Sequence, residues 1–226
     1  MSIHDGHRER LTERYLTYGL DALEEHEVLE MLLFYVIHRK DTNPIAHALI
    51  RRFGSLANVM DASIKELLEI DGIGKKAAIL LQLAKPMCRR YLISQAKDIS
   101  KLDTLEACVD YLRPHFFGAK DEHVLLLCLD AKCRLLCCRE LASGSSISTD
   151  LPIQKAAKLA LESHAVSVVL AHNHPCGDAM PSPEDRHSTI MFRDAMQAIG
   201  VFPADHIIIA ADRFTSMRQS NFFDMA

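Results

Sequence analysis

The sequence predicts an α+β protein in which a helical N-terminal part is followed by a mixed sheet flanked by helices. Apolar residues recur at helical spacing through about residue 95, and from about residue 123 short apolar runs of strand length alternate with helical patterns. Strands and helices mixed in this order are typical of an α/β or α+β domain with one core sheet. A polar stretch at 96–105 separates the two textures, so we expect two domains, 1–98 and 102–226.

The N-terminal part carries clear helix boundaries. Asp21 precedes one amphipathic run and can cap it, whereas Pro44 and Gly54 are a typical start and stop for the next. We expect four helices, at 21–37, 43–53, 63–70 and 75–95.

Residues 70–78, Ile-Asp-Gly-Ile-Gly-Lys-Lys-Ala-Ala, join the last two of these helices. Two glycines around one apolar residue allow a tight turn that leaves backbone N–H groups free at the next helix start, where a phosphate can bind. The segment resembles the hairpin of helix-hairpin-helix modules, which implies DNA as a possible partner. The alternative is a hairpin that only packs two helices together.

The C-terminal part alternates strand and helix patterns. A turn at 130–132 joins two short apolar runs into a hairpin, and the β-branched run 166–172 is too apolar for an edge strand, so we place it centrally. Strands are expected at 123–130, 134–141, 166–172, 206–211 and 214–217, and helices at 151–165 and 183–200.

Composition narrows the function classes. The formal net charge is −4, which argues against binding nucleic acid by bulk charge. No apolar run reaches the roughly 18 residues of a membrane span, and the polar N-terminus lacks the apolar core of a signal peptide. We therefore expect a cytoplasmic protein without a membrane partner, whose seven cysteines are reduced thiols.

The segment from His172 to Asp185, His-Asn-His-Pro-Cys-Gly-Asp-Ala-Met-Pro-Ser-Pro-Glu-Asp, carries the chemistry. His172 and His174 end an apolar strand two residues apart, so both imidazoles point to the same side. Ser182 then caps a new helix, and Asp185 lies in its first turn.

Two imidazoles and one carboxylate with an open fourth position are typical of a catalytic zinc. Such an ion lowers the pKa of its water from about 16 to about 7. Other interpretations exist for each part, since a His-x-His pair can simply end a strand and Ser182 with Asp185 can form a capping box without a metal. Histidines at the end of a core strand, however, need partners to offset their desolvation.

This segment resembles the JAMM signature of MPN-type metalloproteases. Together with 204–209 and 214–217 it is similar to the RadC family, and the likeness extends into the N-terminal half at 8–11, 41–44, 53–56 and 71–74. The resemblance implies an MPN-type fold and a hydrolase that uses one Zn²⁺ to cleave an amide or isopeptide bond in a peptide or protein.

Carried over residue by residue, the family's metal ligands fall on His172, His174 and Asp185. The motif serine, expected to support the tetrahedral intermediate, is Ser182. The general base outside the motif falls on Glu122, just before the first core strand, and Glu140 is the rival because it also lies at a strand end.

Two positions depart from the family pattern. Cys176 stands where relatives usually carry serine, and 148–152 lacks the family's usual His-Pro-Arg-Glu. Asp205 and His206 form a family-like pair whose role is either structural or supportive of the metal ligands. The alternative functions are a DNA-repair protein, including one with nuclease activity, and a metal-free scaffold. The sequence does not predict an oligomeric state.

Overall fold

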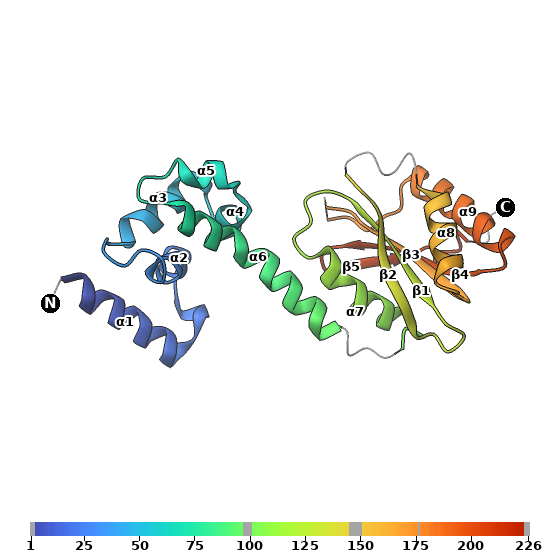
Figure 1. The fold of residues 1–226 in the computed structure, drawn as a ribbon, viewed down its shortest axis with the longest axis horizontal. Coiled ribbons are helices and arrows are strands. Elements are labelled where there is room, and N and C mark those ends of the chain that lie inside the picture. Colours follow the sequence, from blue (N-terminus) through green and yellow to red (C-terminus); the bar gives the residue numbers. More distant parts are fainter. Residues whose placement is uncertain (1–2, 97–100, 145–150, 176, 224–226) are drawn as a thin grey trace. The chain divides into compact units, whose positions relative to one another are not determined.

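A computed structural model describes residues 3–96, 101–144, 151–175 and 177–223 (Figure 1). The chain packs as two compact units, Met1–Cys88 and Arg89–Ala226, which divide within the long helix α6 (Lys75–Ala96). The predicted domain boundary at 99–101 falls largely on residues outside these ranges, so the domain limits 1–98 and 102–226 stay a prediction.

The first unit is entirely helical in its described residues and has its own apolar core (Figure 1). Its elements are α1 (Ile3–Tyr18), the 3₁₀ turn η1 (Leu20–Ala22), α2 (Glu25–Phe34), α3 (Asn43–Phe53), α4 (Leu56–Asp61), α5 (Ile64–Leu68) and the first half of α6. The fully buried side chains of this core come from successive helices: Leu29, Leu33, Leu49, Val59, Leu67 and Leu81.

Two of the four expected helices of this unit are shorter than predicted, and α1 and α4 were not predicted. The expected helix 63–70 is α5, which spans Ile64–Leu68. The expected helix 21–37 is α2, which begins at Glu25, and Asp21 lies in η1 instead of capping it. The backbone N–H of Glu24 donates to the Glu27 carboxylate (2.9 Å), so a glutamate pair starts the helix four residues later. The expected helix 43–53 is confirmed as α3, with Gly54 in the left-handed conformation after it.

The second unit is built on a five-stranded mixed sheet. It contains α7 (Leu105–Phe116), β1 (His123–Leu129), β2 (Leu135–Ser143), α8 (Ile153–Glu162), β3 (Ser167–Asn173), α9 (Pro183–Ala198), β4 (Phe202–Ala210) and β5 (Arg213–Ser216). The strand order is β2-β1-β3-β4-β5, with β3 and β4 parallel and all other neighbours antiparallel. The prediction that the run 166–172 forms a central strand is therefore confirmed.

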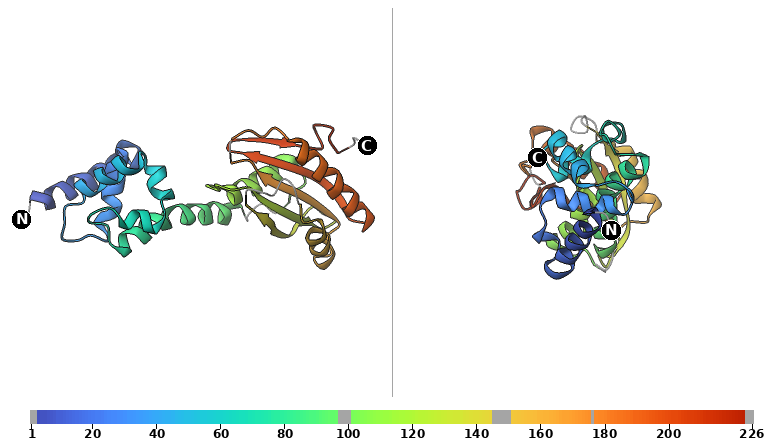
Figure 2. Two further views of the ribbon diagram at one scale, coloured as in Figure 1. Left: turned by 90° about the horizontal axis from the view of Figure 1, so that it is seen from above. Right: turned by 90° about the vertical axis from the view of Figure 1, so that its left-hand side faces the viewer.

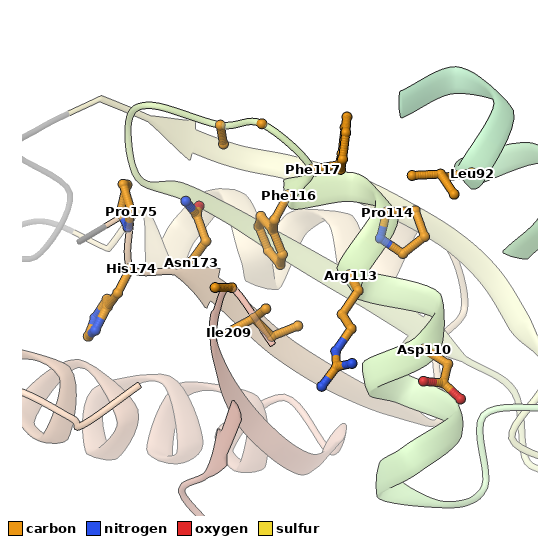
Figure 3. A pocket seen from close by; sticks show the side chains of 13 residues that line it. Leu92, Asp110, Arg113, Pro114, Phe116, Phe117, Asn173, His174, Pro175 and Ile209 are labelled. Atoms are coloured by element: carbon orange, nitrogen blue, oxygen red, sulfur yellow. The ribbon is translucent and has the colours of Figure 1, made fainter. Parts of the chain in front are cut away.

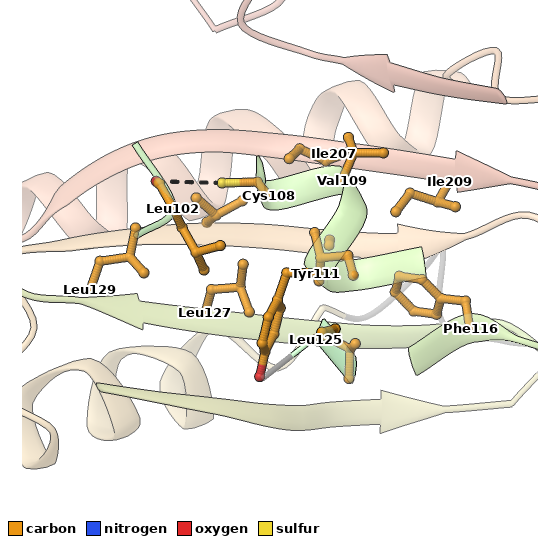
Figure 4. Close-up of a cluster of buried hydrophobic side chains, with 14 residues drawn as sticks. Leu102, Cys108, Val109, Tyr111, Phe116, Leu125, Leu127, Leu129, Ile207 and Ile209 are labelled. Atoms are coloured by element: carbon orange, nitrogen blue, oxygen red, sulfur yellow. Dashed lines mark hydrogen bonds between the residues drawn. The ribbon is translucent and has the colours of Figure 1, made fainter. Parts of the chain in front are cut away.

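Strand alternation gives this sheet two apolar faces. On one face Leu125, Leu127 and Leu129 of β1 pack against α7, a helix that the sequence patterns did not predict (Figure 4). On the other face Val124 and Leu126 pack with residues of α8 and α9. Figure 2 shows the ribbon from two further directions. The unit thus has three layers, and the face covered by α8 and α9 also receives the histidines of β3.

The buried cysteines behave as small apolar residues. Cys108 contributes to the α7 face and Cys128 to the opposite face. Burial raises the pKa of each of these thiols to about 12, which leaves them protonated and unreactive at neutral pH. Cys133 lies in the β1–β2 turn with a φ of 57°.

The hairpin at 70–78 depends on one glycine. Gly72 adopts a φ of 89°, and a Cβ at this position would lie 2.7 Å from the Cδ1 atom of Ile45 on α3. Only a residue without a side chain fits both the left-handed backbone and the contact with α3. Gly74, two residues later, has nothing within 4 Å of a Cβ placed on it.

We expect Gly72→Ala to lower the free energy of unfolding of the helical unit by about 1–3 kcal/mol, because it adds backbone strain and a clash with Ile45. Gly74→Ala is the matched control and should change it by much less. Urea denaturation followed by circular dichroism measures both, and equal effects would contradict the assigned role of Gly72.

Candidate metal centre

The end of β3 places two imidazoles beside each other under the α9 layer. In the β1–β3 pairing His172 lies opposite Val124, and His172 is 5 % exposed. His174 follows two residues later, and its Nε2 atom lies 3.0 Å from that of His172. The period of two along a strand explains why both rings reach the same side.

The first turn of α9 supplies the carboxylate. Ser182 is the N-cap of this helix, and its hydroxyl accepts from the backbone N–H of Asp185 (3.0 Å). In return, the Oδ2 atom of Asp185 accepts from the N–H and the hydroxyl of Ser182, both at 2.8 Å. The capping box therefore exists, and it uses Oδ2 and leaves Oδ1 facing His172.

The three side chains fit a bound metal ion. The Nε2 atom of His172 lies 3.1 Å from Oδ1 of Asp185, and the Nε2 atom of His174 lies 3.4 Å from Oδ2. A tetrahedral ion with bonds of about 2.0–2.1 Å holds its ligand atoms about 3.3 Å apart. Among the described residues this is the one group of three such side chains that could hold a metal.

Hydrogen bonding prepares His174 as a ligand. Its Nδ1 atom lies 2.8 Å from the carbonyl oxygen of Asp178, which can only accept, so Nδ1 carries the hydrogen. In the neutral ring Nε2 then keeps a free lone pair directed at the other two side chains. In the protonated ring Nε2 can donate to Asp185 while Nδ1 donates to the Asp178 carbonyl, and these bonds raise the pKa of His174 against the effect of burial.

The carboxylate of Asp185 stays ionised in this setting. Burial alone would raise its pKa, but hydrogen bonds and charge interactions with His172 and His174, together with the Ser182 N–H, hold the pKa well below its usual range. An anion facing two imidazole lone pairs is an electron-rich site that a cation would stabilise.

The two glutamates considered as general base lie on opposite faces of the sheet. Glu122 precedes β1 by one residue and lines a cavity of about 20 Å³ with His172 and Asp185. That volume has room for about one water molecule. Glu140 pairs with Leu125 of β1, on the α7 face, and its carboxylate lies 3.3 Å from Nδ1 of His123. The geometry thus favours Glu122 and separates Glu140 from the histidine cluster.

A second row of polar side chains lies behind His172. Its Nδ1 atom is 2.8 Å from Nε2 of His206 on β4, and Nδ1 of His206 is 2.6 Å from the hydroxyl of Thr189 on α9. His206 is 2 % exposed and Thr189 is fully buried, and burial holds the pKa of His206 well below its ordinary value. Sequence reasoning considered His206 but missed Thr189, although its position one turn after Asp185 was a usable signal.

A larger cavity, of about 580 Å³, lies at the end of the sheet where β3 and β4 end. It is lined by the end of α7 and by the ends of β3 and β4, and Figure 3 shows Phe116 and Ile209 between His174 at one end and Asp110 at the other. Its lining is mainly apolar, with the Arg113 side chain beside Asp110.

Three other sequence expectations have different outcomes. Cys176 and most of 148–152 lie outside the described residues. Phe223, near the C-terminus, is buried against Ile208 and Met217. The hairpin 70–78 forms, but acidic residues outnumber basic ones in residues 1–88, so DNA binding there stays a prediction.

Comparison with protein families assigns both halves of the chain. A family described as RadC-like JAB domain matches residues 102–222, more than half of the 226 residues. The chain belongs to the RadC family. A second match, described as UPF0758 N-terminal, covers residues 5–79.

The RadC-like JAB match contains the whole candidate centre: Glu122, His172, His174, Ser182 and Asp185. A JAB-like domain with a His-His-Asp group that could hold a metal fits a hydrolase of the JAMM type. None of the described helices combines the length and apolar character that crossing a membrane requires.

We expect Ser182→Ala to remove the side-chain cap of α9 and both hydrogen bonds of the Ser182 hydroxyl with Asp185, while the bond from the backbone N–H remains. The free energy of unfolding should fall by about 1 kcal/mol, and affinity for Zn²⁺ should fall about 10–100-fold because the carboxylate loses its support. Denaturant unfolding and competition with a chromophoric chelator measure the two effects.

Ser63→Ala is the matched control, since Ser63 forms the same capping box with Glu66 at the start of α5. It should reduce stability without changing Zn²⁺ affinity. Equal Zn²⁺ affinities for the two variants would contradict the role of Ser182 in orienting Asp185.

Proposed function

We propose that this protein is a zinc-dependent hydrolase of the JAMM type that cleaves an amide or isopeptide bond. The observation that carries the proposal is the convergence of His172, His174 and Asp185, whose nearest ligand atoms lie 3.0–3.4 Å apart at the end of a buried strand. Two imidazoles and one carboxylate leave a fourth position for water or substrate, as in hydrolytic zinc sites.

The proposed roles follow from position. A bound zinc ion supplies Lewis acidity that makes water a nucleophile at neutral pH. The carboxylate of Glu122, which lines the 20 Å³ cavity with His172 and Asp185, accepts the proton of the attacking water and returns it to the leaving amine. Ser182 holds Asp185 through its capping bonds and, in this proposal, also supports the developing oxyanion.

A peptide or protein substrate is proposed from the surroundings of the centre. The 580 Å³ cavity lined by Phe116, Phe117 and Ile209 borders His174, so an apolar side chain next to the cleaved bond can be buried there. The 20 Å³ cavity beside His172 is too narrow to hold more than water. In this proposal, substrate therefore approaches from the side of the 580 Å³ cavity, at the end of β3.

Metal content is the first test. Untagged protein analysed by plasma mass spectrometry should contain about one zinc per chain, and His174→Ala should lose it because one of three ligands is removed. His187→Ala, on the exposed side of α9, is the control and should keep the metal. A protein that neither contains zinc nor takes it up would overturn the hydrolase proposal.

Substitution of the two glutamates tests the assigned base. Glu122→Gln should lower hydrolysis of peptide or isopeptide substrates by about 10²–10⁴-fold while zinc content stays unchanged, because only proton transfer is lost. Glu140→Gln should retain activity, since that carboxylate faces His123 on the opposite side of the sheet. The reverse result would assign the base to Glu140.

A further inference from the structure

In the polar row behind His172, the backbone carbonyl oxygen of Asp185 can only accept a hydrogen bond, and this fixes the direction of the neighbouring bonds. The hydroxyl of Thr189 lies 2.6 Å from the backbone carbonyl oxygen of Asp185, one helical turn earlier on α9. A carbonyl oxygen only accepts, so the single hydroxyl hydrogen of Thr189 points to it. The hydroxyl oxygen is then left as an acceptor for its other neighbour, His206.

The direction of the Thr189 hydrogen bond also fixes which ring nitrogens of His206 and His172 donate and which accept. Nδ1 of His206, 2.6 Å from the Thr189 oxygen, carries a hydrogen and donates it. His206 is 2 % exposed, because its ring lies between the sheet and α9. A doubly protonated ring is costly in this buried position, so its Nε2 atom is a bare acceptor. Nδ1 of His172, 2.8 Å away, must then be the donor, so in the neutral ring of His172 the Nε2 atom carries no hydrogen.

We infer that Thr189 and His206 are positioning residues that set the tautomer of His172 as a metal ligand, an inference that rests on the metal centre of the proposed function. The row of bonds starts at the Asp185 carbonyl, passes through Thr189 and His206 to His172, and ends where Nε2 of His172 meets the Asp185 carboxylate. One residue of α9 therefore supplies a ligand with its side chain and orders the other ligand with its backbone.

The arrangement has a consequence for metal binding. Neutral histidine exists in two tautomers, and only the one with hydrogen on Nδ1 leaves Nε2 free for the ion. Without the Thr189 hydroxyl, His206 can carry its hydrogen on Nε2 and donate to His172, which places the His172 hydrogen on Nε2 and blocks the ligand atom. Partners that hold the second nitrogen of a metal-binding histidine typically change metal affinity 10–100-fold.

The direct test uses the metal-free wild-type protein and needs no variant. Long-range ¹H–¹⁵N spectra of uniformly ¹⁵N-labelled protein distinguish protonated from bare ring nitrogens, and His172 is assigned by comparison with His172→Gln. We expect a protonated Nδ1 for both His172 and His206, and any hydrogen on Nε2 of His172 is donated to Asp185, 3.1 Å away, and does not bear on the relay. A bare Nδ1 on His172 would falsify the inference.

Matched variants then separate positioning from packing. Thr189→Val removes the hydroxyl at nearly constant volume and should populate the Nε2–H tautomer of His172 and weaken zinc binding about 10–100-fold. Thr189→Ser keeps the hydroxyl and should retain wild-type affinity. A stability loss in Thr189→Val with unchanged tautomer and unchanged zinc affinity would show that Thr189 only satisfies a buried ring, and would overturn the inference.

A second pair covers the case in which Thr189→Val does not fold. His206→Gln can accept from His172 through its amide oxygen and donate to Thr189 through its amide nitrogen, so zinc affinity should be preserved, whereas His206→Leu should lose it. Equal affinities for these two variants would contradict the relay. Absence of hydrolytic activity alone leaves these results in place, because tautomer and affinity are measured without substrate.

Discussion

The antiparallel register between β1 and β3 is the constraint on which the rest of the site depends. Val124 of β1 lies opposite His172 of β3. Because the two strands are antiparallel, this pairing also places Glu122, just before β1, and His174, just after β3, at the same end of the sheet. A slip of one residue would turn every side chain of one strand to the other face of the sheet. Leu126 of β1 lies on one face of the sheet, and Leu125 and Leu127 lie on the other. A slip would move these side chains out of their apolar cores, so their burial fixes the strand pairing and with it the positions of the site residues.

The start of α9 is the second support, because several functions meet in its first two turns. Ser182 caps the helix and occupies one oxygen of Asp185, and Thr189 bonds back to the Asp185 carbonyl. Buried polar groups are costly when unpaired, and here the partners that satisfy them also orient the proposed ligands. A capping box and a metal ligand are therefore compatible uses of the same aspartate, since Oδ1 takes no part in the cap and faces His172.

The helical unit has its own core and a well-defined hairpin, but its charge does not point to a phosphate partner. Gly72 is explained by its contact with Ile45 of α3, which is a requirement of packing. Acidic residues in excess over basic ones weaken the electrostatic attraction that non-specific DNA binding requires. The structural evidence for function is thus concentrated in the sheet unit.

The sequence by itself determined the fold class, the central strand 166–172, the His-x-His spacing and the Ser182 cap, because strand period and helix capping are local properties. It left Glu122 and Glu140 both open, missed the helices α1, α4 and α7, and did not reveal Thr189. Tertiary structure decided these points, since the face of the sheet that Glu140 occupies depends on an irregularity in the β1–β2 pairing between Val124 and Leu125. The contact of Thr189 with His206 likewise joins α9 to β4, residues 17 apart in the chain, and only packing brings them together.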